Sequence, residues 1–424
     1  MALQRRDFLK LSLAGAGAAT LGACSGIGLF GGRKARVVVV GGGFGGATAA
    51  KYLRLWDDGI EVTLIERNAN FISCPFSNLV IGGSKSMTDI SHGYDSLRAK
   101  YGINVMQAEV TAIDPQKQIV TTNTGVMSYD RLVISPGIDF LYTEGLAGLE
   151  SAGAQELIPH AWKAGAQTLN LRRQLEAMPD GGVYVISIPK APYRCPPGPY
   201  ERICQVASYF KASKPKSKII VLDANPEITS KKGLFTKVWA EMYPGMIEYK
   251  PNNTAEEVAI STRTIKTEFE KIKADVLNVV PPQKAGGVAN LAGVVNVDNR
   301  WCGVDFTTYE STGQKNIHVI GDAIAAPLPK SGHMANQTGK VCAGAIVALV
   351  NGDSPVATPK FANTCYSFVN DKEAMHVAGV YQYDAQKKTM AAVDGTVGVS
   401  STWSEAEGVY AEAWAKNIWS DTLK

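Results

Sequence analysis

The chain has 424 residues, enough for two or three domains with a large apolar core. Hydrophobic residues make up 45% of the chain and charged residues 19%, as in a globular protein, and the formal net charge is +4. A charge balance this mild, with no Lys/Arg run and no basic helical stripe in the sequence, does not point to nucleic-acid binding.

The N-terminal segment is predicted to be an export signal rather than part of the fold. Residues 5–10 read RRDFLK and precede an Ala- and Gly-rich run at 11–23. Paired arginines before such a run are typical of the twin-arginine route, and the run is too short to span a membrane. We therefore expect residues 1–32 to be a signal peptide and the protein to be periplasmic; an amphipathic arm is the alternative. Cys24 lies in a lipobox-like context, which leaves both lipidation there and cleavage within 25–32 open.

A strand, a tight turn and a helix then follow one another. Residues 36–40 form a β-branched run that ends in a glycine cluster, and the segment up to residue 56 reads as a helix. Gly41, Gly43 and Gly46 have G-x-G-x-x-G spacing, which suits a tight turn, close approach of a pyrophosphate and close helix–strand packing. The pattern predicts a dinucleotide site at the helix N-terminus; a glycine-rich turn without a ligand is the alternative.

The next predicted strand, 61–65, ends in an acid that fits this site. Glu66 lies about 20 residues after the last glycine of the motif, where a carboxylate accepts the ribose hydroxyls of an adenine dinucleotide. Phe44, inside the motif, and Arg67, next to the acid, are expected to contact the same cofactor.

Two later strands are predicted to return the chain to the cofactor. The segment 129–137 ends in a small-residue turn at Gly137, as in two-dinucleotide flavoproteins. The segment 316–323 ends in Gly321-Asp322, and in flavoproteins an Asp at this point bonds the ribityl chain or the pyrophosphate of FAD.

A helix is expected from about residue 333 to about residue 350, with its positive N-terminal end placed to stabilise negative charge on a reduced flavin. Lys330 and His333 precede or begin this helix. Either side chain would neutralise an anionic flavin, or both would be surface residues.

A second βαβ unit is predicted around strands 182–188 and 218–223. The turn after its first strand, 189–199, is rich in proline instead of glycine. Proline has no N–H group to bind phosphate and does not open the turn as glycine does. We therefore expect this second site to have lost NAD(P)H.

The residues from about 355 onward are predicted to form a third, smaller unit. Segments 365–369 and 377–383 read as strands, and a final helix opens with a capping box at Ser404 and Glu407. The aromatic residues along this helix belong either to the core or to a partner surface.

These motifs, in this order, resemble the flavoprotein subunit of flavocytochrome c sulfide dehydrogenase. The segment 193–201, YRCPPGPYE, carries the most specific part of the resemblance, which covers nearly the whole chain. It implies an α/β fold with two Rossmann-like βαβ dinucleotide-binding domains, glutathione reductase-like, and a small α+β C-terminal domain. The expected divisions are an FAD-binding domain at 33–150 and 281–354, a second Rossmann-like domain at 151–280, and a C-terminal domain at 355–424.

The resemblance also implies an activity: electrons pass from sulfide to FAD and then to a c-type cytochrome subunit. It places a redox-active disulfide at Cys195 and Cys365, and a thioether from Cys74 to the flavin. Hydrosulfide attacks one sulfur of such a disulfide and leaves a persulfide and a thiolate. From spacing alone the pairing stays open, because six cysteines beyond Cys24 allow fifteen connectivities.

Other roles are weighed beside these. Glu201 would move the proton of hydrogen sulfide, or it is a solvated surface residue. Cys74 is otherwise a buried free thiol, and Cys204, Cys302 and Cys342 are expected to be structural. No cysteine spacing matches a metal or c-type haem motif, so we expect no metal site and no haem in this chain.

Several competing functions fit parts of the sequence. One is the flavoprotein of the periplasmic thiosulfate-oxidising system, and another is a sulfide:quinone oxidoreductase. The expected export signal and the lack of an amphipathic C-terminal anchor argue against the second. A flavin-bearing binding module is the non-enzymatic alternative. An NAD(P)H dehydrogenase lacks support because the second glycine motif is missing.

Overall fold

The apolar strand before the glycine cluster lies at the centre of a parallel sheet. The computed structural model describes residues 34–424, so the predicted signal segment lies outside the described residues. The sheet order is β21-β9-β1-β2-β5, and every pairing in it is parallel. Its strands are β1 (Ala35–Val40), β2 (Ile60–Glu66), β5 (Asn104–Gln107), β9 (Arg131–Ile134) and β21 (Ile317–Val319). Strands that are far apart in the sequence, including the late strand near residue 318, thus belong to one sheet.

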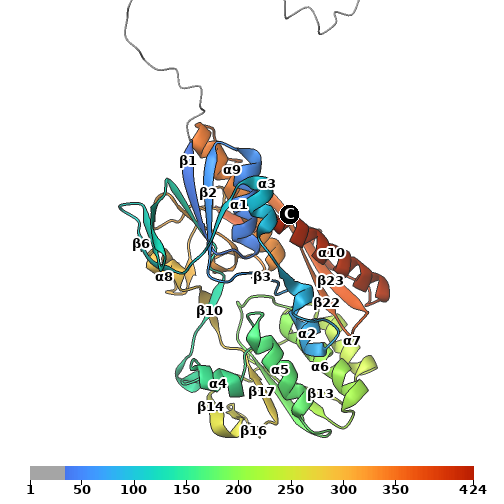
Figure 1. Cartoon of the computed structure of the whole chain (residues 1–424). Coiled ribbons are helices and arrows are strands. Elements are labelled where there is room, and N and C mark those ends of the chain that lie inside the picture. The colour runs from blue at the N-terminus through green and yellow to red at the C-terminus, as the bar shows by residue number, and fades with distance from the viewer. Residues whose placement is uncertain (1–33) are drawn as a thin grey trace, which may run out of the picture. The chain divides into compact units, whose positions relative to one another are not determined.

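Helices cover this sheet because its strands are apolar on both faces. Helix α1 packs against α9, and α3 lies beside α1 (Figure 1). Their bounds are α1 (Phe44–Trp56), α3 (Asp95–Tyr101) and α9 (Gly332–Asn351). A three-stranded antiparallel sheet lies to the left of β1 and β2 in Figure 1, with strands β6 (Val110–Asp114), β7 (Ile119–Thr122) and β8 (Gly125–Ser128). Strands β7 and β8 form a hairpin whose turn lies between Thr122 and Gly125.

A second parallel sheet has the order β13-β12-β11-β17. Its strands are β11 (Val183–Ile188), β12 (Lys218–Asp223), β13 (Ile247–Lys250) and β17 (Val276–Val279). The helices of this part are α4 (Ala152–Leu157), α5 (Ala166–Ala177), α6 (Gly198–Ser213) and α7 (Lys232–Met242). A small antiparallel sheet joins β14 (Glu257–Ala259), β15 (Thr264–Lys266) and β16 (Lys271–Lys273). The chain enters and leaves this part along the antiparallel pair β10 (Ile138–Phe140) and β18 (Gln283–Ala285), visible between the two sheets in Figure 1.

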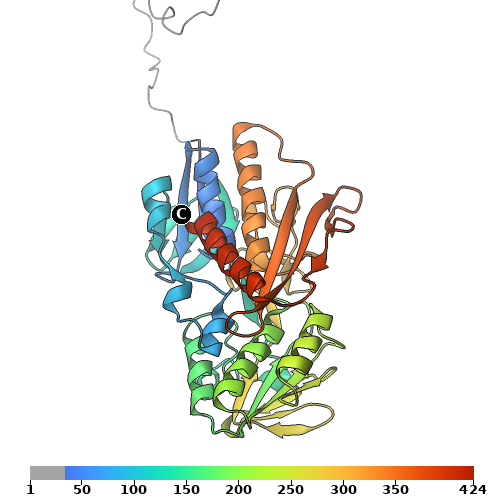
Figure 2. The same ribbon diagram turned by 90° about the vertical axis from the view of Figure 1, so that its right-hand side faces the viewer.

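The C-terminal part is an antiparallel sheet with one long helix. Its elements are β22 (Lys360–Phe368), β23 (Ala374–Asp384), β24 (Thr389–Ala392), β25 (Gly398–Val399) and α10 (Glu405–Leu423). Both long strands extend further than predicted because their full-length pairing, from Lys360 with Gln382 to Phe368 with Ala374, orders their ends. The side chain of Ser404 accepts the N–H of Glu407 at 3.2 Å, as the capping box predicts. Figure 2 shows α10 crossing in front of α1.

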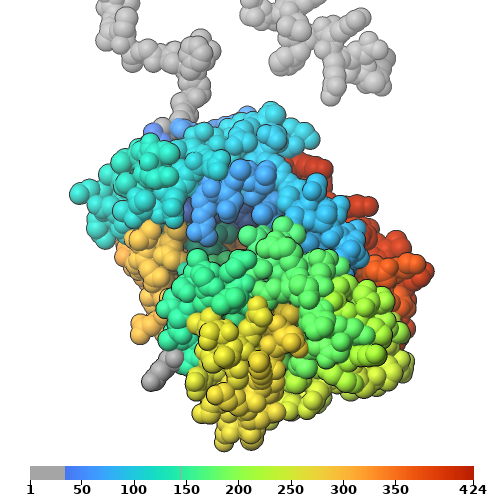
Figure 3. All heavy atoms as spheres, turned by 60° about the horizontal axis from the view of Figure 1, so that its bottom comes forward, coloured from blue at the N-terminus to red at the C-terminus, as the bar shows by residue number. Residues whose placement is uncertain are grey.

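Short elements complete the part that will matter below: β3 (Phe71–Ile72), β4 (Ser91–His92), α2 (Ser77–Gly82), α8 (Val288–Leu291), β19 (Val295–Val297), β20 (Trp301–Cys302) and the 3-10 turn η5 (Gly321–Ala323). The space-filling view shows a recess where the blue and cyan N-terminal residues meet the green residues of the second sheet (Figure 3). Within residues 34–424, no helix combines the length and apolarity that crossing a membrane requires.

Candidate active site

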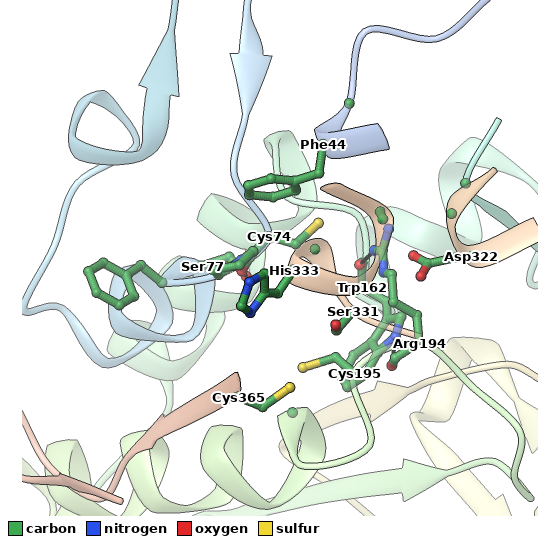
Figure 4. A pocket seen from close by; sticks show the side chains of 18 of the residues that line it. Phe44, Cys74, Ser77, Trp162, Arg194, Cys195, Asp322, Ser331, His333 and Cys365 are labelled. Carbon is green, nitrogen blue, oxygen red and sulfur yellow. Dashed lines mark hydrogen bonds between the residues drawn. The ribbon is translucent and has the colours of Figure 1, made fainter. Parts of the chain in front are cut away.

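A cavity of about 250 Å³ lies where all three parts of the fold meet. Its walls come from the glycine turn, the segment between β3 and α2, the loop before α6, the N-terminus of α9 and strand β22 (Figure 4). The predicted residues that line it are Gly43, Phe44, Cys74, Gly137, Cys195, Glu201, Gly321, Asp322, His333 and Cys365. The other predicted residues, Gly41, Gly46, Glu66 and Arg67, are not in its wall.

The glycine turn has the geometry that a dinucleotide needs. Gly41 has a φ of +98°, and a Cβ there would collide with the carbonyl of Ser135. A Cβ on Gly46 would collide with the carbonyl of Gly41, so the helix can approach the strand only with glycine at this position. A Cβ on Gly43 would meet nothing within 4 Å, which leaves open space on the side of the turn that faces the cavity. These residues fit the pyrophosphate of FAD.

The acid after β2 lies against the same turn. Glu66 accepts the N–H of Gly42 at 2.7 Å through one carboxylate oxygen. Its other oxygen accepts the backbone N–H of Asn68 at 2.8 Å. Arg67 beside it is exposed. The carboxylate of Glu66 is half-buried at the end of its strand, and both Glu66 and Arg67 lie outside the cavity wall.

Asp322 reaches the cavity from η5, directly after the strand that returns to the first sheet. Its carboxylate points into the cavity toward Arg194 in Figure 4. Burial raises the pKa of this carboxyl, and the nearby cations of Arg194 and Lys330 oppose that shift. On the far side Phe44 packs edge-to-face on Phe71 with ring centroids 4.9 Å apart.

The two predicted redox cysteines come from different parts of the fold and face one another. Cys195 lies in the loop before α6 with a φ of +58°, and Cys365 lies on β22. Figure 4 shows both sulfurs directed into the space between them. The two sulfurs are not bonded to each other in this structure. The sequence alone left this juxtaposition open, since the two residues are far apart along the chain.

The backbone around Cys195 holds its thiol at the start of α6. The N–H of Cys195 donates to the carbonyl of Lys330 at 2.7 Å, and the N–H of Gly198 donates to the carbonyl of Cys195 at 2.8 Å. A Cβ on Gly198 would lie 2.9 Å from the Cys195 sulfur, so this glycine makes room for the thiol. Burial raises the pKa of both thiols, and for Cys365 the Lys231 ammonium is the first group that opposes this rise.

Glu201 lies in the first turn of α6 and is buried at 9% exposure. Its carboxylate accepts the N–H of Phe368 at 2.9 Å and the side-chain amide of Asn78 at 2.8 Å. Burial raises the pKa of Glu201, and these two hydrogen bonds oppose the rise. The alternative of a solvated surface glutamate is therefore wrong. A carboxyl with a raised pKa beside two thiols can exchange a proton in this cavity.

Cys74 follows β3 and lies on the opposite side of the cavity from the cysteine pair (Figure 4). Its carbonyl accepts the N–H of Ser77 at 3.0 Å and the hydroxyl of Ser77 at 2.7 Å, so the turn before α2 fixes its position. The other three cysteines, Cys204, Cys302 and Cys342, are fully buried away from the cavity wall.

Lys330, before α9, and His333, in its first turn, are not surface residues. Lys330 is buried and donates to the carbonyls of Asp322 and Ile324, each at 2.8 Å. His333 lines the cavity, and its Nδ1 accepts the N–H of Thr364 at 3.1 Å. Burial lowers the pKa of His333 to about 4, so its imidazole is neutral at pH 7.

Other residues at the cavity were not predicted. Trp162, Arg194 and Arg202 line it, and Lys231 lies just behind Cys365. Arg202 is buried beneath Trp162, with the guanidinium 4.8 Å from the ring centroid. None of them belongs to a motif with a fixed spacing. Arg194 lies within the segment YRCPPGPYE and Arg202 directly follows it, so this segment was the available signal for both; Trp162 had only its place near the domain junction.

The aromatic stripe of the last helix divides between two environments. Tyr410 is 58% exposed, Trp414 lines the cavity, and Ile418 and Trp419 are buried. Neither a wholly buried stripe nor a wholly exposed partner surface describes it.

The position of a second nucleotide site is filled by side chains. At the end of β12, the carboxylate of Asp223 is fully buried and accepts the hydroxyls of Tyr200 at 2.8 Å and Tyr249 at 2.9 Å. Tyr193, also buried, bonds Thr229 at 2.8 Å. The acid that corresponds in position to Glu66 is thus already saturated by protein groups.

Three protein-family models match the chain. A pyridine nucleotide-disulphide oxidoreductase model matches residues 35–166. The central model of the sulfide dehydrogenase (flavocytochrome c) flavoprotein chain matches 168–281, and the flavocytochrome c sulphide dehydrogenase flavin-binding model matches 357–423. The three matches follow the order of the parts of the fold.

Individual relatives agree with these models. The sulfide dehydrogenase (flavocytochrome c) flavoprotein chain of Chlorobaculum thiosulfatiphilum is 67% identical over 45 residues, which are 11% of this chain and 94% of that sequence. The mitochondrial sulfide:quinone oxidoreductase of Mus musculus is 25% identical over 320 residues, 70% of this chain and 67% of its own. The sulfide:quinone oxidoreductase structure from Aquifex aeolicus superposes with a TM-score of 0.74 at 21% identity, covering 91% of each chain. The last similarity confirms the predicted α/β fold.

Proposed function

The chain belongs to the family of the flavoprotein chain of flavocytochrome c sulfide dehydrogenase, whose members oxidise sulfide through FAD, and on this premise we propose that Cys195 and Cys365 are the redox-active pair. Family membership also implies a cytochrome subunit as partner. The single observation that carries the proposal is the approach of two thiols from separate elements within the flavin-site cavity.

The proposed step is a thiol–disulfide exchange with sulfide as the thiol. Hydrosulfide forms a bond to one sulfur of the oxidised pair while the S–S bond breaks. One cysteine then carries a persulfide and the other a thiolate, so the single negative charge of HS⁻ is conserved. FAD, when bound, supplies a two-electron acceptor that can pass electrons on singly to a haem partner.

Glu201 is proposed to accept the proton of hydrogen sulfide. Its carboxylate is buried in the wall that also carries both thiols, and its raised pKa brings it closer to the working pH. The hydrogen bonds from Phe368 and Asn78 orient it. A base in this position produces HS⁻, the nucleophilic form, next to the disulfide.

The cofactor contacts are proposed from the cavity wall. Gly43 and Glu66 would hold the pyrophosphate and ribose, and Asp322 the ribityl chain. The N-terminus of α9, capped by Ser331, would face the ring and favour negative charge there. Cys74 is the proposed covalent attachment point. The intact mass of the acid-denatured protein tests this: a Cys74→Ser variant should lose the flavin increment, and a wild-type mass without that increment would contradict it.

Export by the twin-arginine route, and therefore a periplasmic location, is part of the proposal. Support comes from residues 5–10 of the sequence. A signal-disabled Arg5→Lys, Arg6→Lys double variant should leave the protein in the cytoplasmic fraction; equal periplasmic yield from both forms would contradict this.

Anaerobic addition of sulfide to the purified holoenzyme tests the cysteine proposal. Sulfide should bleach the flavin of the wild type at least as fast as the enzyme turns over. Cys195→Ser and Cys365→Ser should retain flavin that dithionite bleaches but sulfide does not. Cys342→Ser, a buried thiol away from the cavity wall, is the matched control and should behave as the wild type. Normal bleaching of Cys365→Ser by sulfide would contradict the proposal.

A further inference from the structure

A buried lysine lies behind the cysteine pair without a role in the reaction as described so far. Lys231 is 7% exposed. Its Nζ donates to the carbonyl of Cys365 at 3.0 Å and to the hydroxyl of Ser367 at 2.8 Å. Among residues 34–424, no carboxylate lies within ion-pair distance of this ammonium. A buried charge without a close ion pair is costly, so its presence calls for an explanation.

The local backbone gives no structural reason for a lysine here. Lys231 has a φ of +56°, a conformation that non-glycine residues seldom adopt. It occupies the N-cap of α7 without making a side-chain capping hydrogen bond. Ser, Thr, Asp or Asn would satisfy that helix end, and a cation at a helix N-terminus opposes the dipole. Three local preferences are therefore broken at one residue, which is the pattern of a functional position.

Strand geometry places the ammonium on the sulfur side of β22. Residues two apart on a strand point to the same face, so Asn363, Cys365 and Ser367 share one face. Lys231 bonds the side chain of Ser367, and the amide of Asn363 donates to the Cys365 sulfur at 3.4 Å. The sulfur thus has an N–H donor on one side along the strand and a cation on the other.

We propose that Lys231 is the counter-cation of the Cys365 sulfur and holds that sulfur as an anion whenever the pair with Cys195 is open. This role rests on the proposed function of the pair. Lys231 touches neither substrate nor cofactor in the cavity wall, so it is a positioning residue. Opening the pair leaves one negative charge on sulfur, and the ammonium supplies the missing counter-charge without moving a proton.

The charges around the two groups agree with this assignment. Burial lowers the pKa of Lys231 to about 8, and among its neighbours Cys365 opposes that most strongly, followed by Glu201, Cys195 and Glu407. Around Cys365, Lys231 and the hydrogen bonds from Asn363 and Ser331 lower the thiol pKa, and Glu201 raises it. Tyr381 on β23 faces the same sulfur, and burial keeps it neutral by raising its pKa. Lys231 therefore opposes the rise that burial causes in the pKa of the Cys365 thiol, and it does so below about pH 8, where the ammonium is charged.

The test is the alkylation of each cysteine as a function of pH. The holoenzyme is reduced anaerobically with dithiothreitol, pulsed with iodoacetamide from about pH 5 to about pH 10, and digested for mass spectrometry of the Cys195 and Cys365 peptides. Lys231→Gln keeps hydrogen-bonding capacity without charge, Lys231→Met removes both, and Lys231→Arg keeps the charge. Flavin content confirms folding of each variant.

Both uncharged variants should lower the alkylation of Cys365 at pH 7 at least about tenfold, one pKa unit, while Cys195 changes less. Lys231→Arg should restore Cys365 reactivity. Lys51→Met is the matched control: Lys51 is a buried lysine that donates to the carbonyls of Ser420 and Asp421, remote from the cavity wall. It should leave both cysteines unchanged.

Unchanged reactivity of Cys365 in Lys231→Gln, or an equal fall at both cysteines, would overturn the assignment. This outcome is separate from failure of the proposed function. If Cys365→Ser were bleached normally by sulfide, the role of the pair would fail whatever the alkylation profile shows.

Discussion

The two βαβ units of this chain have the same order of elements. They differ in what lies after the first strand and in how the acid after the second strand is surrounded. In the first, three residues separate β1 from α1, and the open space at Gly43 faces the cavity. In the second, the loop between β11 and α6 spans residues 189–197 and includes prolines that have no N–H to offer. The acid of the first unit stays half-buried, and that of the second is sealed by tyrosine hydroxyls.

This contrast shows how one architecture can be used for two purposes. The first unit keeps backbone donors and space for a cofactor. The second has exchanged them for a loop that presents the thiol of Cys195 to the same cavity. Under the proposed function, a site for a diffusible nucleotide is thus replaced by a site for hydrosulfide.

The largest effect should come from filling the close approach in the first unit. Gly46→Val places a branched side chain against the carbonyl of Gly41, so α1 must move away from β1. We expect the purified variant to carry almost no flavin, measured by the ratio of visible to ultraviolet absorbance. Gly153→Ala is the control, because a Cβ there meets nothing within 4 Å; its stability should change by at most about 1 kcal/mol. Full flavin in Gly46→Val would show that the turn does not bind the cofactor.

The next largest effect should come from removing the proposed base Glu201 in α6. Glu201→Gln keeps the side chain's shape but cannot act as a base, so kcat/KM for sulfide should fall by about 10²–10⁴. In the wild type the rate should rise with pH through the raised pKa of Glu201, because the ionised carboxylate accepts the proton. The variant should lack that rise, while titration of hydrogen sulfide itself affects both enzymes alike. Glu227→Gln, an exposed carboxylate, should show the wild-type profile.

The sequence predicted those parts of the molecule that depend on neighbours along the chain. The tight glycine turn, the apolar strands and the Ser404 cap were predicted because each depends on the local preferences of a few residues. The burial of Glu201 was left open because its partners, Asn78 and Phe368, come from distant segments. Lys231 was missed for the same reason, because its partners Cys365 and Ser367 lie on β22, far from it in the sequence.

A smaller effect should come from replacing Asp223, the buried acid of the second unit. Asp223→Asn removes the charged acceptor of two tyrosine hydroxyls, which should lower the free energy of unfolding by about 2 kcal/mol. Urea unfolding measures this. Flavin content and the bleaching by sulfide should stay at wild-type values, because Asp223 is not in the cavity wall. Loss of flavin together with stability would show that the two units are not separate in function.

The smallest effect is expected from a reduced nicotinamide nucleotide. NADH or NADPH added anaerobically in excess should leave the flavin oxidised, since the second unit presents proline and tyrosine where phosphate would bind. Bleaching at a rate comparable with that of sulfide would contradict the contrast between the two units.

The most direct measurement of the central claim is a disulfide map of the oxidised holoenzyme. The protein is alkylated and digested without reductant, and linked peptides are identified by mass spectrometry. We predict one linked pair that joins the peptide of residue 195 to that of residue 365 and disappears when sulfide is added anaerobically. Recovery of both residues as alkylated free thiols from active oxidised enzyme, or a link from either one to another cysteine, would contradict the account.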